Sequence, residues 1–463
     1  MKFLQVITAL SLIAMLFVAS CGDDEPCVES TWYEDADGDG LGNPDVTKTA
    51  CDQPEGYVSN SNDTDDTGGT GGGDSNCNTP GELSQSSNAE IEAMRQAMLT
   101  FQNSLSTSLL EEASTCLDNE RFYLWHNTPN GDGTNRDGII YGDLSDSQLE
   151  NFKTMLKLFL SEGGYQKVDE ITTLAEGLLN ETRPTVWNTD YYSIDLFGDP
   201  ENVGSWGFQL DGHHLAINFL VHGDNVSIVP AFLGGEPAVS SFNGTDFDIF
   251  KDERDLALIL YDGLTSEENN SAVSSGSHAM EVGPAASNGN VDPYRGDYDY
   301  SGFETGLKYS DMTTETQEKL VLVMQEYVYN LTTSFADVWW ADIMENIDNT
   351  YFVWIDEVDN PSASSPFYYR IYNPYLWIEY NCENALGGGG ADYNHVHTIT
   401  RIPNNPATDN GGDYGVFAQI INGGNVKTLY EHYAMADHHK ASHMLFDYKV
   451  SMHHDAHHHG HTH

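Results

Sequence analysis

Basic residues are scarce in this chain of 463 residues. Only 19 are lysine or arginine, against 72 aspartates and glutamates, and the formal net charge is -53. A surface this acidic repels nucleic acid and anionic lipid headgroups, and it attracts cations. The composition therefore excludes nucleic acid as a partner. Acidity alone identifies no cation ligand, because it also keeps exported proteins soluble.

Several catalytic motifs are also missing. The sequence contains no Gly-x-Ser-x-Gly turn, so an α/β-hydrolase serine has no local support. It contains no His-Glu-x-x-His helix, which argues against a zincin protease, and no phosphate loop or dinucleotide fingerprint. No motif of these kinds names a reaction for this chain.

The N-terminus carries an apolar run, "MKFLQVITALSLIAMLFVAS", which ends too soon to span a bilayer as a mature helix. It closes on "VASC", which resembles a bacterial lipobox. The resemblance implies that residues 1–20 are a signal peptide and that Cys21 carries acyl chains, which anchor it firmly in a membrane. The acidic "GDDE" after Cys21 resembles a surface-export signal, so we expect a lipoprotein of the bacterial outer membrane displayed at the cell surface. An ordinary secretion signal with an incidental cysteine is the alternative.

Cysteine is sparse, and export makes disulfides chemically possible. The six cysteines are Cys21, Cys27, Cys51, Cys77, Cys116 and Cys382. Cys27 and Cys51 flank one short module, and we predict that they pair. Lipidation of Cys21 leaves an odd number, so one thiol has no partner within the chain. Pairing of Cys116 with Cys382 is favoured over pairing of Cys77 with Cys116.

Residues 21–58 are predicted to form the lipidated N-terminus and a small cation-binding module. Asp35, Asp37 and Asp39 alternate with small residues that turn the backbone, so their carboxylates can surround one hard cation. The segment resembles the thrombospondin type 3 calcium repeat, although the cysteine often found among its final acidic residues is missing here. We therefore expect these aspartates to bind calcium. No glutamate stands at the twelfth loop position, which excludes an EF-hand, and an acidic spacer is the alternative.

The composition divides the rest of the chain into three further parts. Residues 59–88 are rich in Gly, Ser, Asn and Asp and are predicted to be a flexible linker. Residues 89–442 form the main domain. Residues 443–463 form a C-terminal segment that ends in "MHHDAHHHGHTH", a tract able to bind transition metals loosely.

Periodicity within the main domain predicts helices first and strands later. Helical spacing covers residues 89–117, 145–162, 168–180, 253–262, 315–330 and 335–346, with Asn88 and Ser145 as caps and Gly163-Gly164 as a stop. Strands are expected at residues 191–197, 206–210, 215–222, 226–232, 351–355, 367–372, 376–380 and 395–401. Runs of helices followed by strands predict an α+β fold with a mixed or antiparallel sheet.

Two histidine pairs stand out in the strand pattern. His395 and His397 are two residues apart, so on one strand they project from the same face and can offer two imidazoles to one metal. His213 and His214 are adjacent, so strand geometry allows at most one of them to join a shared site. We expect one to do so and the other to be a hydrogen-bonded support.

The order of motifs resembles the domain of unknown function 3500 family from about residue 119 to residue 439. The likeness is densest in "FGDPENVGSWGFQLDGHHLAINF" and "VPAFLGGEPA", and it continues through "NHVHTITR" and "YEHYAMADHH". The family pattern has a histidine where this chain has Phe367, and the segment before Asp413 is longer here than in the family. The resemblance implies a domain and not a reaction.

The resemblance also selects polar residues within the shared motifs. The candidate metal ligands are His213, His214, His395, His397 and His432, and the candidate catalytic residues are Glu379, Arg370, Arg401 and Asp413. A metal held by three imidazoles keeps an open position for water, whose pKa falls to ~7 on zinc. Glu379 or Asp413 then orients a histidine or acts as the base. The two arginines clamp an anionic substrate or stabilise an oxyanion.

Three functions stay open at this point. The first is transition-metal binding, with zinc, copper or iron as the cofactor and with metal-dependent hydrolysis or redox chemistry. The second is non-enzymatic binding of a glycan or other extracellular nutrient in a metal-free cleft lined by Trp377, Tyr368 and Tyr369. The third is metal scavenging through the C-terminal histidine tract, Met452 to His463. A polar network that only supports the sheet is the structural alternative.

Overall fold

The computed structural model describes residues 30–34, 43–51, 54 and 56–58 near the N-terminus. It also describes residues 85–403, apart from gaps at 117–124, 126, 130–135, 202–203, 277–279, 281–299, 301, 357, 359 and 386–387. The chain divides into two compact units, Met1–Gly71 and Gly72–His463. The predicted signal peptide, most of the predicted linker and the His-rich tail lie outside the described residues. Among the residues that are described, no helix is long and apolar enough to cross a membrane.

The described part of the first unit is a small antiparallel sheet. Its strands are β1 (Ser30–Glu34), β2 (Asn43–Ala50) and β3 (Tyr57–Val58), in the order β2-β1-β3. The indole of Trp32 donates to the backbone oxygen of Ala50 at 3.1 Å and ties the two longer strands together. Asp35, Asp37 and Asp39 fall between β1 and β2, outside the described residues, so the calcium site stays a prediction.

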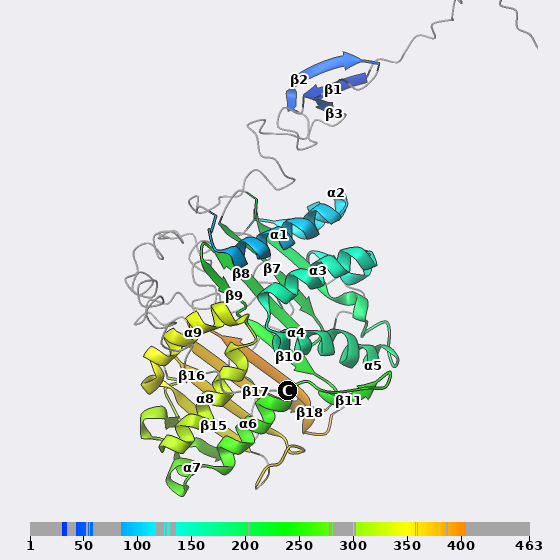
Figure 1. Ribbon diagram of the computed structural model, residues 1–463. Helices are drawn as coiled ribbons and strands as arrows, with labels where there is room; N and C mark the ends of the chain where they lie inside the picture. The colour runs from blue at the N-terminus through cyan, green and yellow to red at the C-terminus, as the bar shows by residue number, and fades with distance from the viewer. Residues whose placement is uncertain are drawn as a thin grey trace, which may run out of the picture. The chain divides into compact units, whose positions relative to one another are not determined.

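The second unit is built on one large mixed sheet (Figure 1), whose main path runs β13-β15-β16-β17-β18-β10-β8-β7-β6-β4. The strands on this path are β4 (Ser114–Thr115), β6 (Ser193–Gly198), β7 (Ser205–Gly212), β8 (Leu215–His222), β10 (Ala231–Gly235), β13 (Val273–Ser275), β15 (Tyr351–Asp356), β16 (Phe367–Asn373), β17 (Leu376–Asn384) and β18 (Ala391–Arg401). Beside the path, β5 (Ile139–Ile140) pairs with β6, β9 (Asn225–Ser227) with β8, and β14 (Leu307–Lys308) with β15. Strands β11 (Val239–Phe242) and β12 (Thr245–Asp248) form a separate hairpin.

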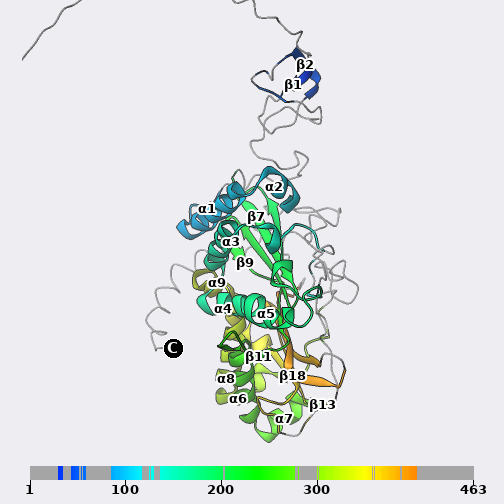
Figure 2. The ribbon, with the colours of Figure 1, turned by 90° about the vertical axis from the view of Figure 1, so that its right-hand side faces the viewer.

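Helices cover one face of the large sheet. They are α1 (Ala89–Ser104), α2 (Thr107–Ala113), α3 (Asp146–Phe159), α4 (Glu162–Asp169), α5 (Glu176–Asn180), α6 (Lys251–Asp262), α7 (Ser266–Ala272), α8 (Thr314–Val328) and α9 (Thr333–Glu345). Figure 2 shows α1, α3, α4, α6 and α8 on the same side of the sheet. Most sheet neighbours are antiparallel, while β4 with β6 and β13 with β15 are parallel. The predicted α+β class is therefore confirmed.

The helix-covered face of the sheet is apolar. Phe208 and Phe219 on neighbouring strands stack at 4.2 Å between ring centroids, and Phe159 of α3 packs edge-on against both. All three rings are fully buried. Burial of each contributes roughly 1.5–3 kcal/mol, so this contact between α3 and the strands β7 and β8 helps to hold the helical layer on the sheet.

The opposite face of the sheet is also buried, and it carries polar side chains beside an apolar cluster that includes Phe232, Trp377 and Ile399. Cross-strand partners share a face, and the register places one set of buried polar side chains on it: Asp195, Gln209, Asn218, Arg370, Glu379, Asn381 and Arg401. Buried polar groups need partners; the amide of Gln209, for example, donates to Asn218 at 2.6 Å. His395 and His397 lie on this same face, because they alternate with the apolar-face residue Val396 along β18.

Some predicted element ends agree with the structure and others do not. The helix expected over residues 89–117 is two helices that end at Ser104 and Ala113, and the helix expected from residue 168 already begins at Glu162. Asn88 caps α1, and Ser145 with Gln148 forms the predicted capping box of α3. The glycines at 163 and 164 do not stop that helix: α3 ends at Phe159, and both glycines lie in the first turn of α4. A Cβ on Gly164 would lie 2.3 Å from a backbone oxygen of the segment after α8, so close packing is what requires glycine there.

The strand expected at 226–232 is also wrong as a single element. β9 ends at Ser227 and β10 begins at Ala231. Pro230 lies between them, and proline has no N–H to donate to a ladder. The break frees β10 to pair with β18, which β9 does not reach.

The cysteines correct another expectation. Cys51 and Cys116 each belong to a disulfide, while Cys382 is a buried thiol on β17. The favoured pairing of Cys116 with Cys382 is therefore wrong. Cys116 follows β4, which is six neighbours away from β17 along the sheet. Strands lie ~4.8 Å apart and a disulfide needs Cα atoms within about 7 Å. Cys27 lies outside the described residues, so its pairing with Cys51 stays a prediction.

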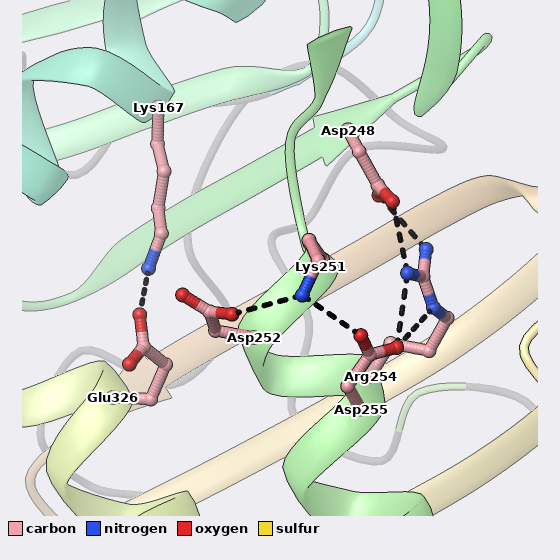
Figure 3. Close-up of polar contacts among 7 residues, drawn as sticks. All are labelled: Lys167, Asp248, Lys251, Asp252, Arg254, Asp255 and Glu326. Atoms are coloured by element: carbon pink, nitrogen blue, oxygen red, sulfur yellow. Dashed lines mark hydrogen bonds and ion pairs between the residues drawn. The ribbon is translucent and has the colours of Figure 1, made fainter. Parts of the chain in front are cut away.

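A buried ion-pair network joins three helices on the covered face. The ammonium of Lys167 on α4 lies 2.6 Å from a carboxylate oxygen of Glu253 on α6 and 2.9 Å from one of Glu326 on α8. Figure 3 shows Lys167 reaching Glu326, and the nearby pairing of Arg254 with Asp248. Burial raises the pKa of the Glu253 carboxyl to about 7, although the Lys167 ammonium opposes this shift.

Glu268 provides a test of how polar contacts stabilise this layer. Its carboxylate accepts hydrogen bonds from the backbone N–H groups of Thr265 and Thr313 and from the Thr265 hydroxyl. Burial raises the pKa of Glu268, but these donors outweigh it and hold the pKa at about 2, below the usual 4.5. Because the folded-state pKa is the lower one, the stabilisation is present above the unfolded pKa and is lost as pH falls through the folded pKa.

We predict that Glu268→Ala lowers the free energy of unfolding at neutral pH by about 1.5–3 kcal/mol, the value of hydrogen bonds to a charged group. The difference from the unsubstituted protein should shrink as pH falls from about 5 towards 2. Urea unfolding at several pH values measures both quantities. An equal difference at every pH would contradict the assigned role of the carboxylate.

Candidate metal centre

Three histidines converge at the polar face of the sheet. The possible ligand atoms of His214, His395 and His397 all lie within 4.8 Å of one another. The Nε2 atom of His395 is 3.3 Å from that of His214 and 3.2 Å from that of His397. His395 and His397 come from β18 and share a face, as their spacing predicts. His214 comes from a part of the chain 181 residues away from His395.

The turn between β7 and β8 delivers His214. Gly212 pairs with Leu215 across the hairpin, so His213 and His214 are its two turn residues and do not alternate as strand residues would. His214 has a φ of 60°, an uncommon backbone conformation for a non-glycine residue that marks a place to look for function. Its backbone N–H donates to Asn127 and its carbonyl accepts from Gly234, and these bonds hold the turn against β10.

Hydrogen bonds at the far side of two rings determine what points inwards. Nδ1 of His395 lies 2.7 Å from the backbone oxygen of Asn384. A carbonyl oxygen only accepts hydrogen bonds, so Nδ1 of His395 carries the proton. In a neutral imidazole, Nε2 then has a free lone pair. Nδ1 of His397 faces the carboxylate of Glu383 at 3.4 Å, which favours the same tautomer.

Lone pairs that face each other at 3.2 Å cannot form a hydrogen bond, but they can share a cation. In a tetrahedral zinc site with Zn–N bonds of ~2.0–2.1 Å, neighbouring ligand nitrogens are about 3.3 Å apart. The distances from Nε2 of His395 to Nε2 of His214 and of His397 match this edge, and all possible ligand atoms of the three residues lie within 4.8 Å of one another. The geometry of the three nitrogens therefore fits a transition-metal ion.

Electrostatics favour the unprotonated imidazoles that a metal requires. Burial, together with the neighbouring histidines, lowers the pKa of His214 well below its usual range. Burial also lowers the pKa of His397, although Glu383 opposes the shift. Burial raises the pKa of the Glu383 carboxyl, but the hydrogen bond with His397 outweighs this effect and holds that pKa at about 2. The site thus combines neutral nitrogen donors with an ionised carboxylate behind them.

The site is open on one side. The His214 residue is 5% exposed, whereas the side chains of His395 and His397 are 14% and 16% exposed. Glu236, whose carboxylate lies 3.6 Å from Nδ1 of His395, and Glu383 are also partly accessible. Three ligands and a solvent-facing side leave a position for water or substrate, which is the arrangement of catalytic zinc sites.

His213 has the supporting role expected of one member of the adjacent pair. Its Nδ1 atom lies 2.7 Å from a carboxylate oxygen of Glu176 on α5. Its ring stacks on that of His214, with 3.8 Å between centroids. The hydroxyl of Tyr192 donates to its backbone oxygen. His213 does not belong to the group of three converging histidines.

The structure places the predicted catalytic residues in other contacts on the same sheet face. Glu379 accepts hydrogen bonds from the Tyr368 hydroxyl and the Trp377 indole. The guanidinium of Arg370 bonds to Thr305 and lies over the rings of Phe303 and Trp377. Arg401 lies over Trp125 and is 0% exposed. These contacts tie the three residues into the packed sheet, and their catalytic role stays a prediction.

The remaining candidates are Asp413, His432 and the aromatic residues expected to line a metal-free cleft. Asp413 and His432 lie outside the described residues. Trp377, Tyr368 and Tyr369 are all buried, and Tyr369 bonds to Tyr327 of α8, so these rings do not line an open cleft.

Sequence reasoning missed the residues that orient the rings. Glu383 and Asn384 lie at the end of β17, and only their contacts in the folded hairpin show that they face His397 and His395. Glu236 follows β10, and Glu176 lies on a helix far from any histidine motif. A carboxylate has no local signal for such a role, because the contact depends on tertiary packing.

Gly234 tests whether the site depends on close approach of the two ligand-bearing segments. A Cβ at Gly234 would lie 3.0 Å from Cδ2 of His397 and 3.2 Å from Cδ2 of His214. We predict that Gly234→Ala displaces these rings and weakens metal binding by about tenfold or more, as measured by isothermal titration with Zn²⁺. Gly163→Ala is the control, because a Cβ there would meet only the Ser161 hydroxyl oxygen, at an ordinary contact distance of 4.0 Å. Unchanged affinity in Gly234→Ala would show that the rings do not hold the metal in this geometry.

Comparison with known proteins agrees with the motif resemblance. No curated protein and no solved structure matches this chain closely enough to count as a relative. One family model, described as a protein of unknown function, DUF3500, matches residues 87–415. This match includes His214, His395, His397 and the strands that position them. Since it covers most of the chain, the chain belongs to the DUF3500 family.

Proposed function

We propose that this chain binds one transition-metal ion through His214, His395 and His397 and uses its open position for metal-dependent chemistry. The convergence of three imidazoles carries the proposal: Nε2 of His395 lies 3.3 Å from that of His214 and 3.2 Å from that of His397, and Asn384 and Glu383 favour neutral tautomers with unprotonated Nε2 atoms on His395 and His397. The histidine group itself belongs to the described structure. The ion and the reaction are the proposed part.

The donor set limits the metal. Imidazole nitrogens suit zinc, copper and iron, whereas calcium and magnesium prefer oxygen. Three neutral ligands leave the charge of a divalent ion uncompensated, and the carboxylates of Glu236 and Glu383 beside the rings supply the counter-charge. Zinc and copper(II) are the best matches, because both bind imidazole strongly in the divalent order of affinity.

The chemistry follows from the open position. A divalent metal there supplies a Lewis acid and a hydroxide at neutral pH, which suits hydrolysis, and a redox-active metal supplies electron transfer. The carboxylates of Glu383 and Glu236, which lie at the Nδ1 side of the rings, would orient the imidazoles. A metal-free binding cleft is the alternative that the metal test decides.

Elemental analysis of the full chain is the test of the metal site. The unsubstituted protein, purified without added metal, should hold about one equivalent of zinc, copper or iron more than the His395→Ala/His397→Ala variant. Both proteins keep the His-rich tail, so its loose binding cancels in the comparison. Equal metal content after loading and desalting, with both proteins folded by circular dichroism, would contradict the proposal.

We also propose that the domain is carried on a lipid-anchored stalk at the outer membrane. The lipobox resemblance at Cys21, the acidic residues that follow it and the calcium-repeat pattern of Asp35, Asp37 and Asp39 support this. Disulfide bonds at Cys51 and Cys116 fit an oxidising compartment. In this proposal Cys27 pairs with Cys51 and closes the module.

Mass spectrometry of protein extracted from membranes tests the stalk. The mature chain should begin at Cys21 with the added mass of its acyl chains, and under native conditions a chelator should remove one calcium ion. A chain that begins elsewhere or carries no acyl group would contradict the anchor. A mass unchanged by the chelator would contradict the calcium site.

A further inference from the structure

A buried carboxylate on the helical layer reaches the metal centre through one histidine. Glu176 is 3% exposed, and its carboxylate lies 2.7 Å from Nδ1 of His213, which is 9% exposed. Burying an ionised carboxylate against a sheet is costly unless it is hydrogen-bonded. The contact with His213 satisfies the Glu176 carboxylate. This pair lies directly behind His214, because the ring of His213 stacks on the ring of His214.

The backbone of the helix is arranged to aim Glu176 at the sheet. Residues Glu170–Ala175 form a π-helix between α4 and α5. One series of buried positions, Gly164, Val168, Thr172 and Glu176, is spaced four residues apart, beside others such as Ile171 and Ala175. In a continuous α-helix of 3.6 residues per turn, this spacing would drift by about 120° over three steps. The wider π-turn absorbs the drift, so Glu176 still faces the sheet, and such turns are frequent at functional sites.

The neighbours of His213 hold it in place. Its ring also stacks with Trp187, at 6.2 Å between centroids and an interplanar angle of 28°. The Arg183 guanidinium lies over the Trp187 ring. The Tyr192 hydroxyl bonds to the His213 backbone. The imidazole that supports His214 is therefore anchored by its nitrogen, its ring face and its backbone.

We infer that Glu176 and His213 are a positioning pair, which holds the ring of His214 so that its Nε2 atom meets those of His395 and His397. His395 and His397 have oxygen acceptors at their Nδ1 atoms, a backbone carbonyl and a carboxylate. The stacked, carboxylate-anchored His213 orients the third ligand. This inference rests on the proposed metal site and assigns residues outside the ligand set to it.

Cobalt(II) titration of the full chain, followed by visible absorption, tests the pair. Glu176→Ala should weaken Co²⁺ binding by about 10–100-fold, the usual effect of losing an outer-shell partner, and should change the d–d spectrum of the bound ion. Glu176→Gln keeps an oxygen that accepts from Nδ1 and should recover most of the affinity and the original spectrum. His213→Phe keeps a flat ring but loses the hydrogen bond to Glu176, so its Co²⁺ affinity and spectrum should resemble those of Glu176→Ala. If Glu176→Ala does not fold, His213→Phe provides the test.

Glu268→Ala is the matched control. Glu268 is another buried, hydrogen-bonded glutamate, but it lies on α7, which packs beside β13 and β15 at the other end of the sheet path from β7. This variant should lose stability while it keeps the affinity and spectrum of the unsubstituted protein.

The outcomes separate the two proposals. Wild-type affinity and spectrum in both Glu176→Ala and His213→Phe would overturn the positioning pair, even with a functioning metal site. A wild-type chain that binds no more Co²⁺ than His395→Ala/His397→Ala would overturn the metal site itself, and the positioning pair with it.

Discussion

The candidate site depends on the pairing of β10 with β8 on one side and β18 on the other. This register sets Gly234 opposite His397 and Leu233 opposite Leu215, so the β7–β8 turn comes to lie beside β18. β10 supplies no ligand. Its Gly234, which has no side chain, leaves room for the imidazoles of His214 and His397 to approach each other as a shared ion requires. Three nitrogens from distant parts of the chain meet for this reason.

The rest of the domain can be understood as support for that pairing. One face of the sheet is apolar and holds the helices, with Phe159, Phe208 and Phe219 at a central contact. The other face buries polar groups among apolar ones, which is tolerated because the polar groups bond to one another or lie over aromatic rings. The helical layer reaches the histidines by sending Glu176 to the hairpin turn. The scarcity of lysine and arginine suits such a site, since an acidic chain attracts metal cations.

Local patterns predicted more of the fold than of the site. Caps at Asn88 and Ser145 and most helices and strands follow from contacts within a few residues. The errors occur where contacts between distant parts of the chain override the local pattern. Position 164 requires glycine because it packs against the segment after α8, and Cys382 lies too many strands from Cys116 to pair with it. The roles expected for Arg370, Arg401 and Glu379 came from their motifs, whereas the structure gives these side chains aromatic and hydroxyl partners.

The sequence by itself determined the α+β class, the acidic surface and the pairing of His395 with His397, because composition and the two-residue period of a strand are local properties. Only the tertiary structure decided that His214 and not His213 joins them. That choice depends on a two-residue turn with positive φ at His214, on the register of β10 and on the carboxylate of Glu176, none of which follows from spacing along the chain. Ligand geometry is a product of strand register and helix packing, and both bring together residues that no sequence window contains.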